Sequence, residues 1–242
     1  MRDLRRLRVC TAALVCLGFT GGGVAWADEA HDREHWADSP YAPHVTNGPV
    51  AKIGTIVGVV YGERQDVTAI GLAASAGQRF GRFTLESEYQ YLQFQERGPS
   101  SIRLGDGHRL GAMARLDVIR IGPRYVGGNS LLSIYVEGGA AVAWNMWTQP
   151  GYDEPSRIVP ADSKRVEGQA GFGMEIEHRL QEPIGFPKRI GWFLGWRGAF
   201  APHEVGPAEV CRGVSCRPAP MMPMQRYTDR SLLFQSSLAV TW

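Results

Sequence analysis

Seven charged residues fall on the polar side of an alternating pattern that runs through most of the chain. They are Glu86, Glu88, Arg115, Asp117, Glu137, Glu175 and Arg197. If that side is enclosed, these groups must be paired or hydrated, because burial of an isolated charge is costly. The pattern therefore predicts a structural network of salt bridges. A proton- or ion-sensing cluster is the alternative, since carboxylates outnumber basic groups in this set.

Two cysteines are the next residues with distinctive chemistry. Cys211 and Cys216 lie close together in the sequence, and in an exported protein this spacing predicts one disulfide that closes a short loop. A metal site is the alternative, but a C-x4-C pair with only His203 nearby lacks four ligands. We therefore expect no metal and no cofactor.

The first 27 residues have the features of a secretory signal peptide. Arginines precede an apolar stretch, and Ala25-Trp26-Ala27 forms an A-x-A cleavage site. A lipoprotein signal that uses Cys16 is the alternative. Residues 28–50 are polar, with three histidines, and predict a flexible periplasmic tail, with a metal-binding tail as the alternative.

Composition limits the classes of partner and of membrane segment. The 242 residues carry a net charge of +2, which gives no reason to expect a nucleic-acid partner. After the leader, no apolar run reaches the roughly 18 to 20 residues that a transmembrane helix needs. If the chain crosses a membrane, it must therefore do so as strands.

The rest of the chain, residues 51–242, contains eight alternating segments of a length that suits tilted membrane-spanning strands. The segments are Lys52 to Gly62, Val67 to Gln78, Gly81 to Phe94, Arg109 to Ile121, Leu131 to Trp147, Arg165 to His178, Arg189 to Phe200 and Ser231 to Trp242. An even number of strands brings both ends of a closed up-and-down barrel to the same side. We predict an all-β, closed antiparallel, eight-stranded transmembrane barrel.

The two sides of these segments differ in bulk as well as in polarity. In the last segment Leu232, Leu238 and Val240 share one side, whereas Gln235 and Ser237 share the other. Elsewhere the polar side also carries many glycines, whose small size suits the crowded interior of a narrow barrel. We therefore expect the apolar side to face lipid. A soluble barrel with the opposite arrangement is the alternative.

Aromatic residues and connection lengths predict an orientation. Aromatic side chains fall toward both ends of the strands, as in the girdles at the two membrane interfaces. Those expected near the periplasmic ends are Phe83, Trp192 and Trp242, and those expected toward the outer ends are Tyr61, Tyr89, Tyr91, Trp144, Trp196 and Phe200. Scattered aromatic residues of a hydrophobic core are the alternative. With a periplasmic N-terminus, the expected turns on the periplasmic side are short, and most links on the outer side are long. An eight-stranded barrel is filled by side chains, so we expect no open pore.

The alternating strands and the aromatic C-terminal residue Trp242 resemble the small outer-membrane barrels of the OmpA and OmpW kind. The resemblance implies a Gram-negative outer membrane, with membrane lipid, lipopolysaccharide and the barrel assembly machinery as partners. The last strand, in this resemblance, carries the assembly signal. A structural or surface-interaction role is expected, and the surface ligand, if there is one, is not identified.

A narrower resemblance concerns lipid A deacylases of the PagL type. The segments around Glu137 and Glu175 are similar to strands of that family, in which a membrane-facing H-x-S pair and an acid form the catalytic site. Phe200 and Pro202 occupy the expected positions of the histidine and the serine. A shifted site with His203 as the base, Ser231 as the nucleophile and Asp229 as the orienting acid is the enzyme alternative.

Overall fold

The structure is a computed structural model. It describes residues 47–61, 67–96, 103–122, 130–148, 157–159, 163–180, 187, 189–204, 209–212, 215–218 and 226–242. The predicted signal peptide and all but the last few residues of the predicted tail lie outside these ranges. Within the described residues, no helix has the length and hydrophobicity required to cross a membrane.

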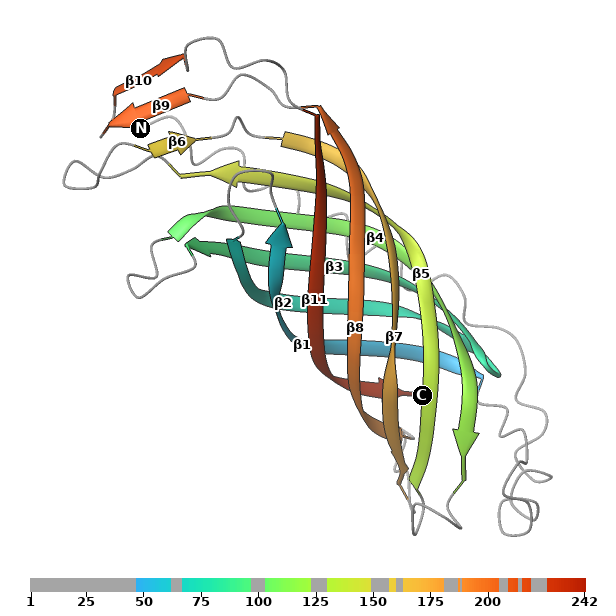
Figure 1. Ribbon diagram of the computed structural model, residues 1–242. Coiled ribbons are helices and arrows are strands. Elements are labelled where there is room, and N and C mark those ends of the chain that lie inside the picture. Colours follow the sequence, from blue (N-terminus) through green and yellow to red (C-terminus); the bar gives the residue numbers. More distant parts are fainter. Residues whose placement is uncertain are drawn as a thin grey trace.

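Eight long antiparallel strands form a closed barrel (Figure 1). They are β1 (Gly48–Tyr61), β2 (Val67–Phe80), β3 (Phe83–Glu96), β4 (Arg103–Ile121), β5 (Ser130–Trp147), β7 (Ser163–Arg179), β8 (Arg189–Glu204) and β11 (Arg226–Thr241). Each strand pairs with its neighbours in the barrel, and β11 closes the ring by pairing with both β1 and β8. The predicted fold class is confirmed.

The strands are longer than the sequence pattern indicated, and one turn falls at a different place. The β2–β3 turn lies at Gly81 and Arg82, with Phe80 paired to Phe83. Gly81 has a positive φ of 60°, which glycine adopts without the strain that a Cβ would introduce. Our expectation that Gly81 begins a strand is therefore wrong.

We call the end of the barrel where β1 begins and β11 ends the terminus end, and the opposite end the loop end.

β4 contains an irregularity between Asp117 and Ile119. Here strict alternation fails, and the adjacent residues Val118 and Ile119 both face outward. An extra residue of this kind shifts the following side chains to the other face. As a result Arg120 is buried on the same face as Asp117.

The exterior of the barrel is apolar. Exposed residues along the strands include Ile53, Leu72, Val166, Phe172 and Leu238, each more than half exposed. In β11, Gln235 and Ser237 are instead buried. The faces are therefore arranged as predicted, with bulk outside and polar groups inside.

Side chains fill the interior. The rings of Tyr135 on β5 and Phe193 on β8 stack inside it with centroids 4.8 Å apart. A Cβ added to Gly173 or Gly195 would lie 2.2 or 2.3 Å from the Tyr135 hydroxyl, so these two positions leave no room for a larger residue. Toward the loop end one part of the interior is an apolar cluster, which consists of Ile56, Val60, Val67, Ala69, Ala73, Leu92, Phe94, Leu104 and Leu233.

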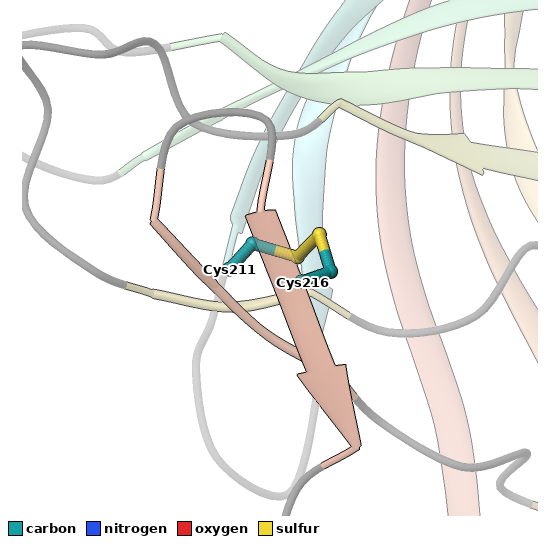
Figure 2. Close-up of a disulfide and its surroundings, with 2 residues drawn as sticks. All are labelled: Cys211 and Cys216. Atoms are coloured by element: carbon teal, nitrogen blue, oxygen red, sulfur yellow. A yellow bond between two sulfur atoms is a disulfide. The ribbon is translucent and has the colours of Figure 1, made fainter.

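A small second sheet lies at the loop end and was not predicted. It consists of β6 (Arg157–Val159), β9 (Glu209–Arg212) and β10 (Ser215–Pro218), in the order β10-β9-β6. Cys211 and Cys216 are directly paired across β9 and β10 and form a disulfide (Figure 2). The sheet therefore joins the segment between β5 and β7 to the segment between β8 and β11 (Figure 1).

Candidate functional site

The largest group of ion pairs lies in the interior toward the terminus end. Arg79 on β2 contacts both Glu175 and Glu177 on β7, with 2.9 Å between its Nη2 and Oε2 of Glu175. Arg115 on β4 also binds Glu175, and its Nη2 lies 2.8 Å from Oδ1 of Asp117. Because β2 and β7 lie four strands apart in a barrel of eight, the Arg79 pairs cross the full width of the interior.

Two further groups of residues lie next to this one. Arg197 on β8 contacts Glu88 on the opposite strand β3, and its Nε donates to Oε1 of Glu137 over 2.8 Å. Lys52 on β1 pairs with Glu86 on β3, and Ser75 Oγ donates to the second Glu86 oxygen over 2.9 Å. All these side chains are almost fully removed from solvent.

A fourth group holds two arginines around one carboxylate. Arg109 on β4 and Arg165 on β7 each lie 2.7 Å from an oxygen of Glu167 on β7. The Arg109 Nη2 is also 3.5 Å from Ser231 Oγ on β11. This group therefore extends the charged interior beyond the others, through residues of β4, β7 and β11.

The structure brings all seven of the charged residues named from the sequence into the interior. It also adds further charged residues there, and more of these are basic than acidic. Among the described residues, eight interior cations contact seven carboxylates. The cations are Lys52, Arg79, Arg109, Arg115, Arg120, Arg165, Arg189 and Arg197, and the carboxylates are Glu86, Glu88, Asp117, Glu137, Glu167, Glu175 and Glu177. Our expectation of an acidic excess is therefore wrong for the described interior.

Most of the missed residues could have been found from the pattern. Lys52 and Arg109 begin two of the segments expected from the sequence and Arg79 directly follows a third, and all three are buried on the polar side of their strands. Arg120 gave no such signal, because only the irregularity in β4 turns it inward.

This arrangement can stabilise a closed barrel. Each interior charge lies against an opposite charge, so much of the cost of removing it from water is offset. Because pairs such as Arg79 with Glu175 and Arg197 with Glu88 join opposite strands, they also fix the distance between those strands. Charged groups paired this tightly are suited to a structural role.

The three residues of the enzyme alternative lie on neighbouring strands near the loop end. His203 on β8 pairs with Tyr227 of β11, and Asp229 on β11 pairs with Ala201 of β8. The side chains of His203 and Asp229 lie outside the described part of the structure. Ser231 is buried, and its hydroxyl lies beside the interior residue Arg109. A membrane-facing serine, as in the deacylase resemblance, would require the opposite face.

One polar constellation lies on the outside of the barrel toward the loop end. Tyr91, His108, Trp144 and Lys164 are consecutive register partners across β3, β4, β5 and β7. We call these four residues the outward polar row. The His108 Nδ1 lies 2.7 Å from the hydroxyl of Tyr89, and the Lys164 Nζ lies 5.5 Å from the centroid of the Trp144 ring.

The outward polar row is flanked by a further charged pair. Asp106 accepts a hydrogen bond of 2.9 Å from the Tyr91 hydroxyl and also one from Arg103. Sequence reasoning assigned the aromatic residues of this region to a girdle but did not identify His108, Asp106 and Lys164. Asp106 and His108 lie two residues apart on β4, but the position of His108 beside Tyr91 and that of Lys164 beside Trp144 could be recognised only with the strand register.

Metal ligation finds no support in the described part of the chain, where no group of three or more His, Cys, Asp or Glu residues is placed to hold an ion.

One aromatic residue also differs from its expected position. Trp196, expected near the outer end of its strand, lies in the middle of β8, where its ring packs against Phe234 with centroids 4.9 Å apart.

Comparison with known proteins supports the fold. No family model matches the sequence, and no curated protein matches it significantly. The crystal structure of Neisserial surface protein A (NspA) is similar, with a TM-score of 0.51 and 12% identity over 81% of this chain and 97% of that one. The outer membrane protein OprG from Pseudomonas aeruginosa gives a TM-score of 0.40 and 11% identity over 83% of this chain and 98% of that one. The likeness to NspA supports the fold alone, an all-β closed antiparallel barrel of eight strands.

Proposed function

We propose that this protein is a small β-barrel of the Gram-negative outer membrane, reached after signal-peptide cleavage, with a structural or surface-interaction role. The observation that carries the proposal is the inverted arrangement of the barrel. A soluble barrel buries its large apolar side chains and exposes charge, whereas here Phe172, Trp192 and Leu238 face outward and the charged network is buried. An apolar exterior of this extent is stable in lipid and not in water.

The loop end is the end that faces the cell surface in this proposal. It carries the small disulfide-bonded sheet of β6, β9 and β10, and loops held on a rigid barrel are where binding usually takes place. The filled interior supports a protein that is not an open pore. Membrane lipid and lipopolysaccharide surround the barrel, and the assembly machinery acts through β11, because this strand closes the ring.

Folding into membranes tests the proposal. The mature chain is unfolded in urea and diluted into phospholipid vesicles without detergent. The folded barrel should then enter the vesicles and run faster on a gel before boiling than after it. A chain that stays dissolved in buffer as a folded monomer, with no vesicles and no detergent, would overturn the proposal.

A further inference from the structure

The outward polar row lies on a face that is otherwise apolar. Along β4 the next outward residue toward the terminus end is Leu110, and along β5 and β7 the corresponding residues are Val142 and Val166. A barrel wall that only contacts acyl chains has no need of a histidine, a lysine and a hydrogen-bonded carboxylate. The polar groups therefore indicate a ligand whose polar part lies at this level.

The donors of the row fit an anionic group. If the Tyr89 hydroxyl donates to His108 Nδ1, the proton of the imidazole is on Nε2, which is then free to donate. Lys164 is exposed and adds a positive charge beside Trp144, a residue type favoured at membrane interfaces. Asp106, the nearby carboxylate, is neutralised by Arg103. The row thus presents donors and positive charge, as phosphate recognition requires.

A patch of small residues lies below the row toward the terminus end. The patch begins four residues from the outward polar row along the strands. Its members are Ala112, Ala114, Gly138, Ala140, Gly168, Ala170 and Gly198. They are register neighbours and face outward. A Cβ added to Gly138 or Gly168 would meet no atom closer than 3.7 or 3.9 Å, so the surface here is open. We call these residues the small-residue patch.

The dimensions of the two features match one kind of lipid. Strands lie about 4.8 Å apart, so the row spans about 14 Å across β3, β4, β5 and β7, and the patch spans about 14 Å across β4, β5, β7 and β8. The patch begins about 13 Å from the row, at roughly 3.3 Å per residue. A wide head group above a surface that accommodates several acyl chains fits a phosphorylated disaccharide lipid better than a lipid with one phosphodiester and two chains.

We propose that the exterior of β3, β4, β5, β7 and β8 binds lipid A, with a phosphate against His108 and Lys164 and acyl chains over the small-residue patch. The inference rests on the proposed function, because only an outward loop end places the row in the leaflet that contains this lipid. The site is separate from the buried network and from the residues of the enzyme alternative.

Lipid binding to the folded barrel in detergent tests the head-group contacts. The probes are bisphosphorylated lipid A, the same lipid without phosphates, and phosphatidylglycerol. One charge near an anionic lipid surface contributes about a fivefold change in affinity. The variant H108Q/K164Q, which removes the one positive charge of the row and its imidazole donor, should therefore bind lipid A at least about fivefold more weakly than the parent. The control R230Q, which removes an exposed cation on β11, should bind like the parent.

A second pair of variants tests the patch. Ala140→Leu fills it, and Ala74→Leu adds the same side chain to the exposed exterior of β2, on another part of the barrel. Only the first should weaken lipid A binding. The inference is overturned if lipid A binds equally well to the parent and to H108Q/K164Q, or if all three probes bind equally well to the parent. In either case a barrel that remains heat-modifiable leaves the proposed function intact. A parent that does not enter vesicles removes both.

Discussion

Replacing Arg197 with methionine should destabilise the barrel strongly. Among the described residues, Arg197 is the cation that contacts both Glu88 and Glu137. Its loss leaves two carboxylates inside the barrel without an opposite charge. Breaking a buried ion pair by removing one partner costs about 3–5 kcal/mol, so we expect a loss of unfolding free energy at least in this range.

Replacing Arg115 provides a matched comparison within the same interior. Its partners Glu175 and Asp117 keep other cations, because Glu175 also binds Arg79 and Asp117 also binds Arg120. We therefore expect Arg115→Met to cost only about 1.5–3 kcal/mol, the range for the loss of hydrogen bonds to charged groups. The exposed Arg230→Met should change stability by less than about 0.5 kcal/mol.

Urea unfolding in phospholipid vesicles, followed by tryptophan fluorescence and by gel migration, measures these effects. With a slope of about 2 kcal/mol per molar urea, Arg197→Met should lower the unfolding midpoint by about 1.5–2.5 M. The triple variant R197M/E88Q/E137Q removes all three charges together and should recover most of the loss, because replacing a complete buried ion group is often nearly neutral. A single variant that unfolds like the parent, or a triple variant no more stable than the single one, would refute the reasoning.

Three other outcomes follow from the same structure. Phe172→Arg places a charge on the exposed exterior and should cost about 2–4 kcal/mol of folding free energy in vesicles, measured by the same unfolding curves; a gain in stability would contradict the lipid-facing assignment. Removal of both cysteines, Cys211 and Cys216, should leave vesicle insertion and heat-modifiable migration unchanged, because the disulfide lies in the small sheet and not in the barrel. Incubation of the folded protein with lipopolysaccharide should release no 3-hydroxy fatty acid, since the Ser231 hydroxyl lies inside the barrel; release that is lost in Ser231→Ala would establish the enzyme alternative.

The sequence predicted the barrel well because a strand with one face in lipid must alternate along its whole length. Gln235, Ser237 and Leu238 could be assigned to faces from β11 alone, without knowledge of their neighbours. Where alternation fails locally, the prediction failed with it. The irregularity after Asp117 turns Arg120 inward, and nothing in the local sequence distinguishes this residue from an outward one.

Features that depend on contacts between distant strands could not be predicted. The pairing of Arg79 with Glu175 joins residues 96 positions apart across the barrel. The outward polar row likewise exists only because the register places His108 beside Trp144 and Trp144 beside Lys164. In the small sheet at the loop end β6 pairs with β9, and these strands belong to two separate segments between barrel strands. No local sequence pattern therefore predicts the sheet.

Electron paramagnetic resonance of spin labels in lipid vesicles tests the central claim, which is that the apolar face is in lipid and the polar face is inside. In a chain without Cys211 and Cys216, one label replaces the exposed Leu238 and another replaces its buried neighbour Ser237. The label at position 238 should collide often with oxygen, which concentrates in lipid, and rarely with a water-soluble nickel complex, whereas the label at position 237 should collide little with either. Frequent oxygen collisions at position 237, with position 238 open to the nickel complex, would contradict the account.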